Sequence, residues 1–254
     1  MAIPGASSVT TVIEAPKKQW LTARIAEIID ETPRVRTLML DVPGWPGHKA
    51  GQHVDVRLTS EDGYQAQRSY SIASAPGEAR VRLTIEMLTE GEVSSYLAGE
   101  ARVGDSIEMR GPIGGYFVWS EALEGPLFLV GGGSGIVPLI AMIRSHAASE
   151  STAKFRLLYS VRTPEDAFFA DELARLEGDG LEITWVYTRQ APEGWPTPAG
   201  RVTLDALRSA TFPSSGTPAV FVCGPTGFVE SVATWLVELG HEPAAVKTER
   251  FGGA

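Results

Sequence analysis

A run of glycines between two apolar stretches constrains the fold of this chain more than any other feature. The segment 126–144 reads PLFLVGGGSGIVPLIAMIR. The apolar residues before the glycines favour a buried strand and those after them favour a helix, with a tight loop between. Glycine permits positive φ angles and close approach of a ligand, and the free N–H groups at a helix start attract anions. We therefore interpret the segment as a strand, a phosphate-binding loop and a helix.

This loop differs from the usual Rossmann loop, which carries three glycines at fixed spacing. Here Gly133 and Gly135 are followed by Pro138 at the place of the third glycine. Proline suits the first turn of a helix, because its missing N–H would have no partner there. An ordinary strand-to-helix turn is the competing interpretation. The segment 125–143 carries no charge, but its glycines and Pro138 would leave backbone groups unpaired in lipid, so we predict no membrane span.

Residues 20–120 alternate between apolar and polar side chains with a period of two. Val81, Leu83 and Ile85, for example, alternate with Arg82 and Thr84, which is typical of a half-buried strand. About six such segments at short spacing predict an antiparallel sandwich or small barrel. The expected strands are 20–29, 38–42, 53–58, 64–73, 79–88 and 106–109, with a short helix near 93–98.

After residue 125, strand and helix patterns alternate. The expected strands are 127–130, 155–161, 181–188, 220–223 and 245–249, and the expected helices are 138–147, 166–176, 204–209 and 228–239. Such alternation predicts a five-stranded parallel sheet covered on both faces, with ligands at the carboxyl ends of its strands. We therefore divide the chain into a flexible lead-in at 1–19, an antiparallel β domain at 20–120 and an α/β domain at 125–254.

Charge and cysteine content argue against several classes of site. The chain has 22 Lys and Arg against 31 Asp and Glu, a net charge of -9, which argues against a nucleic-acid partner. The single cysteine, Cys223, cannot form an intramolecular disulfide or a cysteine-built metal site. The four histidines lack metal-ligand spacing, so we predict no metal. Residues 1–19 lack the charged start and apolar core of a secretory signal, so we expect a cytoplasmic protein.

Further short motifs lie on both sides of the glycine loop. They read RSYS at 68–71, GEVSS at 91–95, GPIGGYF at 111–117, CGPT at 223–226 and ERF at 249–251. On a strand, Arg68 and Tyr70 point to one face, so that a phosphate-binding arginine lies beside an aromatic ring. Ser94 could cap a helix or bind a diphosphate. Taken singly, each motif also fits an ordinary strand, capped helix or loop.

In this order, the motifs resemble those of the ferredoxin:NADP reductase family of flavoenzymes, over residues 20–251. The resemblance implies a six-stranded antiparallel flavin-binding β-barrel at 20–120, followed by a five-stranded parallel nucleotide-binding α/β domain at 125–254. It implies FAD rather than FMN as the flavin, because relatives of this layout mostly use FAD, and NADPH or NADH as the reductant. Tyr64 is a candidate to stack on the adenine.

The resemblance also implies roles for residues at matching positions. In the barrel, Arg68 would pair with the flavin diphosphate, Tyr70 would stack on the isoalloxazine ring and Ser71 would approach its N5 atom. The rest of the implied flavin site comprises Ser69, Gly91, Val93, Ser94 and Gly114. In the α/β domain, the implied nucleotide site comprises Gly131, Gly132, Gly133, Ser134, Gly135, Pro138, Gly224 and Pro225.

The end of the chain completes the implied catalytic set. Phe251 would cover the flavin face where the nicotinamide must land, Glu249 would relay a proton, and Cys223 would line the nicotinamide's approach. The implied catalytic residues are therefore Tyr70, Ser71, Cys223, Glu249 and Phe251. Three residues follow the aromatic here, whereas relatives end on it.

The choice of nucleotide depends on the adenosine ribose. A 2′-phosphate favours arginine, whereas a plain ribose often meets an acid at the end of the second strand. That strand ends here in Tyr159-Ser160-Val161-Arg162, and Arg189 and Arg201 flank a later loop. Relatives selective for NADP bind the phosphate with arginines in comparable places. The resemblance therefore favours NADPH, with NADH as the alternative, and implies a site formed by Ser160, Arg162, Arg189 and Arg201.

The implied reaction is hydride transfer from NAD(P)H to the flavin, followed by single-electron transfer to an acceptor. A fused plant-type iron–sulfur domain needs four cysteines, and this chain has one. Its electrons would therefore pass to a separate protein, such as a ferredoxin or metalloprotein. A flavin or quinone reductase without a protein partner, and a redox-inactive nucleotide-binding subunit of the same fold, are the alternatives.

Overall fold

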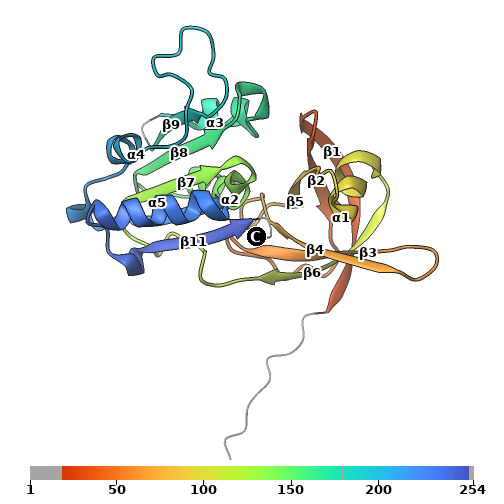
Figure 1. Ribbon diagram of the computed structural model, residues 1–254. Helices are drawn as coiled ribbons and strands as arrows, with labels where there is room; N and C mark the ends of the chain where they lie inside the picture. Colours follow the sequence, from red (N-terminus) through yellow and green to blue (C-terminus); the bar gives the residue numbers. More distant parts are fainter. Residues whose placement is uncertain (1–18, 179, 252–254) are drawn as a thin grey trace, which may run out of the picture.

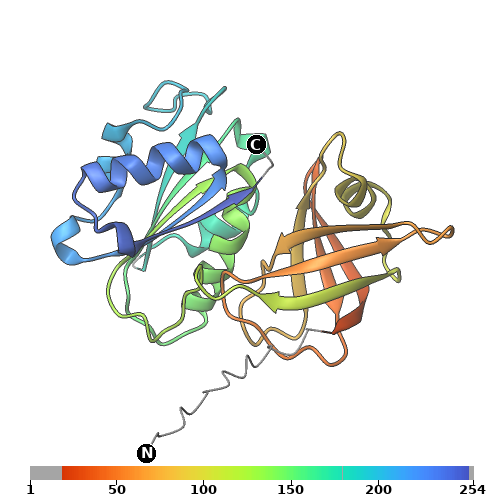
Figure 2. The same ribbon diagram turned by 60° about the horizontal axis from the view of Figure 1, so that its bottom comes forward.

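The computed structural model describes residues 19–178 and 180–251, which form two sheets with their own helices. Figure 1 shows an antiparallel sheet from the first part of the chain beside a parallel sheet from the second part. Figure 2 shows the same two parts of the chain with the lower side of Figure 1 turned forward. No helix among these described residues is both long enough and apolar enough to cross a membrane.

The first sheet has six antiparallel strands, as the period-two pattern predicted. The order in space is β4-β3-β6-β1-β2-β5. An isolated bridge between Ile72 and Leu83 brings the end of β4 to β5, the opposite edge, so the sheet curls toward closure. The strands are β1 (Trp20–Thr32), β2 (Val35–Asp41), β3 (His53–Thr59), β4 (Gln65–Ser71), β5 (Val81–Glu86) and β6 (Ser106–Ile113).

Alternation along these strands decides which side chains fill the barrel. Val54 and Val56 of β3 are fully buried, and in register they pair with Tyr70 and Arg68 of β4. Because paired residues share a face of the sheet, Arg68 and Tyr70 belong to the inner face of an edge strand. Helix α1 (Glu92–Ser95) and a π-helical turn (Tyr96–Glu100) replace the single helix expected at 93–98.

The second sheet has five parallel strands in the order β11-β10-β7-β8-β9. Every residue of the central strand β7 is buried, as expected for a sheet covered on both faces. The strands are β7 (Leu127–Gly132), β8 (Phe155–Val161), β9 (Leu181–Tyr187), β10 (Ala219–Pro225) and β11 (Val246–Phe251), and the helices are α2 (Ile136–Ala147), α3 (Ala170–Leu176), α4 (Leu204–Ala210) and α5 (Thr226–Glu238).

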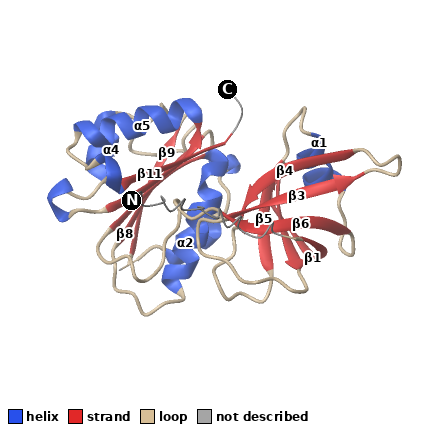
Figure 3. Cartoon of the chain, turned by 90° about the horizontal axis from the view of Figure 1, so that it is seen from below, coloured by secondary structure: helices blue, strands red, loops and turns tan. Residues whose placement is uncertain are grey.

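Two hydrophobic clusters lie on opposite faces of this sheet. Leu129 and Phe221 pack with α2 and α3, whereas Val130 and Val222 pack with α4 and α5. Figure 3 shows α2 on the side of the sheet that faces the barrel, with α4 and α5 on the other side. The helix that follows the glycine loop therefore lies between the two domains.

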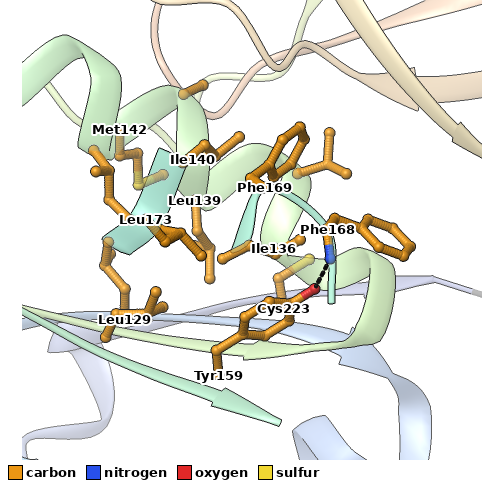
Figure 4. Close-up of a cluster of buried hydrophobic side chains, with 14 of the residues drawn as sticks. Leu129, Ile136, Leu139, Ile140, Met142, Tyr159, Phe168, Phe169, Leu173 and Cys223 are labelled. Atoms are coloured by element: carbon orange, nitrogen blue, oxygen red, sulfur yellow. Dashed lines mark hydrogen bonds between the residues drawn. The ribbon is translucent and has the colours of Figure 1, made fainter. Parts of the chain in front are cut away.

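The helix expected at 166–176 is interrupted. A short 3-10 helix ends at Asp166, and Phe169 has a positive φ of 58°, so α3 begins only at Ala170. The physical reason is burial, because the rings of Phe168 and Phe169 turn into the core shown in Figure 4. The Phe168 N–H donates to the buried Tyr159 hydroxyl at 3.2 Å.

The two domains are joined by a continuous core and by a hydrogen bond from a buried arginine, Arg144. The barrel contributes Ala73 and Trp119 to the same cluster as α2. Arg144 of α2 is 8% exposed and donates to the Ala73 carbonyl at 2.6 Å and to both carboxylate oxygens of Glu172 in α3 at 2.8 and 2.6 Å. Burial alone would raise the pKa of Glu172, but Arg144 holds that pKa below its usual value.

Candidate functional site

The carboxyl ends of three parallel strands bring together motifs that are far apart in the sequence. Cys223 of β10 lies in register with Gly131 of β7 on one side and Glu249 of β11 on the other. Two residues later, Pro225 pairs with Phe251. The predicted nucleotide loop and the predicted catalytic end of the chain therefore meet at one edge of the sheet, where parallel sheets bind ligands.

The glycines of the loop serve different purposes. A Cβ on Gly135 would lie 2.1 Å from the Cys223 carbonyl oxygen, and one on Gly132 would lie 2.9 Å from the Phe228 ring. These glycines, and Gly131 beside Leu139, allow close packing within the protein. Gly133 has a φ of +54° and nothing within 4 Å of a Cβ, so its backbone faces open space where a phosphate can approach.

Helix α2 follows this loop closely. A 3-10 turn covers 133–135 and α2 begins at Ile136. Pro138 is thus in the first turn of the helix, where the sequence placed it and where its missing N–H has no partner to lose. The helix start and its unpaired N–H groups favour an anion at this loop.

Two adjoining cavities run from the loop along the strand ends. The loop cavity, about 240 Å³, is lined by Gly132, Gly133 and Ser134 and by barrel residues. The arginine cavity, about 470 Å³, is lined by Arg162 and Arg201. Both cavities are lined by Ser160, Arg162, Thr188, Pro225 and Phe228, so together they form one groove.

Arg189 is separated from the other predicted arginines. Its backbone N–H donates to the Arg162 carbonyl at 2.9 Å, and its side chain is exposed. It lines neither the loop cavity nor the arginine cavity. The structure therefore brings Ser160, Arg162 and Arg201 together and leaves Arg189 beside them.

Strand β4 presents a polar and aromatic surface at the edge of the barrel. Burial raises the pKa of Tyr70 to about 12, against the opposing effect of the Arg68 charge, so its phenol is neutral. Arg68 is exposed and donates from Nη1 to the Gln67 carbonyl at 2.6 Å. Ser69 donates to Asp55 on β3 at 2.7 Å. The Ser71 hydroxyl is buried without a hydrogen-bond partner among the described residues.

The segment before α1 does not use Ser94 as a helix cap. Gly91 is the N-cap and makes no side-chain cap bond. The Ser94 hydroxyl donates to the Gly91 carbonyl at 3.2 Å and accepts from the Leu88 N–H at 3.3 Å. Val93 is 1% exposed and packs in the barrel core. Core packing of Val93 and the two hydrogen bonds of Ser94 therefore fix the position of α1.

A larger cavity follows the same strand away from Ser71. This hairpin cavity, about 830 Å³, is lined by Ala66 of β4 and by Tyr64, Glu92 and Tyr96. The Tyr64 ring is 58% exposed, and its hydroxyl donates to Glu92 at 3.0 Å. Along β4, the order is therefore Tyr70, Arg68 and then the hairpin cavity.

The glycine turn after β6 lies against β3. Gly114 has a φ of +97°, and the Gln52 side chain donates to its carbonyl at 2.6 Å. A Cβ on Gly114 would lie 3.5 Å from the His53 ring. His53 pairs with Ser71 in register, so this turn borders the end of β4.

Two titratable groups at the carboxyl edge have shifted pKa values. Burial raises the pKa of Glu249 to about 7. Burial, and then the charge of Glu249, raises the pKa of the Cys223 thiol well above its usual value. Near neutral pH the thiol is therefore protonated, whereas Glu249 exchanges a proton readily. Phe251 is partly buried and packs against the core shared by the two domains.

These features fit a flavin and a dinucleotide. The buried Ser71 hydroxyl is a polar group that lacks a partner within the described chain, which is unusual in proteins. Gly133 leaves room for a ligand at the helix start, and the two linked cavities form an extended groove. Within residues 19–178 and 180–251, no group of three or more His, Cys, Asp or Glu side chains could hold a metal ion.

Family models match both domains. The oxidoreductase FAD-binding domain matches residues 23–118, and the oxidoreductase NAD-binding domain matches residues 129–234. The chain belongs to the ferredoxin:NADP reductase family. The six-stranded barrel and the five-stranded parallel domain are those that the resemblance implied.

Curated members of the family align with most of this chain. The NADH oxidoreductase HCR of Escherichia coli is 30% identical over 220 residues, which cover 85% of this chain and 64% of that protein. The glycine betaine monooxygenase reductase subunit of Chromohalobacter salexigens is 30% identical over 236 residues, covering 90% of this chain and 63% of that protein. The chain thus spans somewhat less than two thirds of these relatives.

Solved structures of the family share the fold. The FAD/NAD-binding domain of a nitric oxide dioxygenase from Vibrio cholerae aligns with a TM-score of 0.80 at 24% identity, over 92% of this chain and 99% of that one. A cytochrome P450 reductase from Amycolatopsis also aligns with a TM-score of 0.80 at 24% identity, over 96% of this chain and 73% of that one.

Several residues that line the two cavities were not predicted from the sequence. Arg34 enters the loop cavity from the turn between β1 and β2. Phe228, Ser231 and Trp235 reach the arginine cavity from α5. Their helical spacing of three to four residues was visible, but that pattern also describes an ordinary amphipathic helix.

Proposed function

We propose that this chain is an FAD-dependent NAD(P)H reductase that passes electrons to a separate acceptor, such as a ferredoxin or a metalloprotein. The observation that carries the proposal is the Ser71 hydroxyl, which follows Tyr70 at the end of β4 and is buried without a hydrogen-bond partner among the described residues. A bound ligand that reaches this hydroxyl would complete its hydrogen bonding. The matched FAD-binding and NAD-binding domains support the same conclusion.

The barrel residues hold and orient the flavin. Tyr70 offers an apolar ring face, Ser71 offers one hydroxyl proton to an acceptor on the ring edge, and Arg68 offers a cation to the diphosphate. Bound FAD would supply the hydride acceptance and the one-electron release that amino-acid side chains lack. The protein contributes position and a dry surface at the shared core.

The order of features on β4 favours FAD over FMN. The Tyr70 ring comes first, the Arg68 cation lies two residues away, and the hairpin cavity beyond it contains Tyr64 and Tyr96. An extended dinucleotide has its ring, diphosphate and adenosine in that same sequence. FMN would leave the aromatic lining of the hairpin cavity without a role.

The α/β domain binds the reductant and favours NADPH. The loop at Gly133 takes the diphosphate, and the arginine cavity takes the adenosine end. Two arginines and two serines, Arg162, Arg201, Ser160 and Ser231, line that cavity, which provides charge-assisted donors for a 2′-phosphate. Arg162→Ala should therefore raise the KM for NADPH far more than the KM for NADH.

At the nicotinamide end, the chain provides one group that can exchange a proton. Glu249, with its pKa near 7, can hold or release a proton at neutral pH. Cys223 keeps its proton and is fully buried in the core that α2 covers, so it lines neither the loop cavity nor the arginine cavity. Phe251 lies in register with Pro225 at the same edge and would yield its place to the nicotinamide.

The deciding experiment is an anaerobic spectrum of the purified protein. We expect a yellow protein with bound FAD, bleached by NADPH and recoloured by an oxidised iron–sulfur or haem protein. A colourless protein that does not take up FAD would refute the proposal. Rapid turnover with free flavin or quinone, and none with metalloproteins, would instead identify a reductase without a protein partner.

A further inference from the structure

The turn between β1 and β2 reaches from the barrel into the nucleotide groove. It consists of the two residues between Thr32 and Val35. The loop cavity is lined on its barrel side by Thr32, Arg34 and Val35, and on its other side by the glycine loop. An arginine of the flavin domain therefore shares a cavity of about 240 Å³ with the phosphate-binding backbone of the other domain.

Arg34 is held in place at both ends of the residue. Its backbone carbonyl accepts a hydrogen bond from the Met87 N–H at 2.8 Å, and its Nη2 donates to the Met87 carbonyl at 2.9 Å. Its own N–H donates to Thr32 Oγ1 at 3.3 Å. A guanidinium has five N–H donors, so one bond to Met87 orients the group and leaves donors for an anion.

The charges around the cavity are mixed. Arg34 and Arg162 line it together with the carboxylates of Glu86 and Asp166. Asp166 accepts a hydrogen bond from Thr163 at 3.1 Å, at the start of the segment that precedes Phe168. The two carboxylates offset the two arginines in formal charge, so the N–H groups of the loop tip the cavity toward an anion, which the arginines can bind by charge-assisted hydrogen bonds.

We propose that Arg34 binds the diphosphate of the nicotinamide dinucleotide from the side opposite the glycine loop. This inference rests on the proposed function, because it assumes that NAD(P)H occupies the groove. The diphosphate is then held by backbone N–H groups of one domain and by a guanidinium of the other. Nucleotide binding consequently bridges the domains, and the barrel contributes to selection of a diphosphate over a monophosphate.

The test compares ligands with and without a diphosphate. Oxidised holoprotein is titrated calorimetrically with ADP-ribose and with adenosine 2′-monophosphate, or with adenosine if the parent does not bind the monophosphate. Arg34→Ala should weaken ADP-ribose binding by about ten- to a hundredfold, the size of a charge-assisted hydrogen bond, and should change binding of the second ligand less than about twofold. Arg34→Lys should fall between the parent and the alanine variant.

A matched variant controls for lost charge. Arg24→Ala removes an exposed arginine elsewhere on β1, and should leave both affinities unchanged. FAD absorbance should be identical in all variants, which shows that the barrel is intact. The slope of log affinity against log salt for ADP-ribose should be shallower in Arg34→Ala than in the parent.

Two results would overturn the assignment. One is equal affinity of the parent and Arg34→Ala for ADP-ribose. The other is an equal loss for both ligands, which would mean that Arg34 shapes the groove rather than contacts the diphosphate. A parent holoprotein that binds neither NADP⁺ nor ADP-ribose would instead refute the proposed function itself, and the role of Arg34 with it.

Discussion

At Ser71, we expect one substitution to affect the stability of the apoprotein and the reduction of the flavin differently. Its hydroxyl is buried and unpartnered within the described chain, and an unsatisfied buried hydroxyl costs free energy. Ser71→Ala should therefore leave the apoprotein as stable as the parent, or more stable by about 1 kcal/mol. The same variant should reduce flavin more slowly in the holoprotein. Thermal unfolding of both forms and stopped-flow reduction by NADPH measure the two effects, and a marked loss of apoprotein stability would contradict the assignment.

Glu249 makes stability depend on pH. Its folded pKa, about 7, lies above the ordinary value of 4.5, so the folded protein binds this proton more tightly than the unfolded chain. Its stabilising effect is complete below pH 4.5 and is lost as pH rises through 7. Glu249→Gln should therefore be more stable than the parent at pH 8, by up to about 3 kcal/mol, and equally stable near pH 4. Denaturant unfolding at both pH values tests this, with Glu242→Gln as an exposed control.

At the scale of the element, the glycine loop combines a binding position with packing positions. Gly135→Ala should unfold or strongly destabilise the protein, because the added Cβ would lie 2.1 Å from the Cys223 carbonyl oxygen. Gly133→Ala meets no atom within 4 Å, so it should fold with a loss of about 1 kcal/mol from its positive φ while binding NADP⁺ more weakly. Melting temperature and NADP⁺ affinity separate the two. Similar melting temperatures of the two variants would contradict the assignment of Gly135 to packing and Gly133 to binding.

The same scale shows where local patterns succeed and fail. All eleven strands of the part of the chain that the structure describes were expected from alternation and apolar runs, because side-chain period and strand geometry are local properties. The prediction of a helix over 166–176 was wrong at its start, because burial of Phe168 and Phe169 overrode the helical pattern there. The prediction that Ser94 could cap the helix was also wrong, since its hydroxyl donates to the Gly91 carbonyl.

For the whole molecule, Arg144 links the two domains through its hydrogen bond to the Ala73 carbonyl. Arg144→Met would remove the hydrogen bond to Ala73 and leave the Glu172 carboxylate without its partner. We expect a loss of about 2–4 kcal/mol in the free energy of unfolding, since breaking a mostly buried ion pair strands a charge. Arg208→Met, which breaks an exposed pair with Asp205, should cost about 0–1 kcal/mol. Equal losses of unfolding free energy in the two variants would contradict the prediction, because they would show that the buried pair stabilises the protein no more than the exposed pair.

The sequence by itself determined the two sheets, their order and the motifs that carry the chemistry. Hydrophobic period is written in neighbouring residues, and a glycine loop or an RSYS strand end is recognisable without knowing its surroundings. The family resemblance then assigned Arg68 and Tyr70 to the flavin and Gly133 to the nucleotide diphosphate.

Only the tertiary structure decided which residues share a cavity. Arg34 is far from the glycine loop in the sequence but lines the same cavity, whereas Arg189 lies outside the groove that Arg162 and Arg201 line. The physical reason is that cavity walls form where distant elements pack. The turn between β1 and β2 enters the groove because Arg144 and the shared core hold the barrel against α2, and no local pattern encodes that contact.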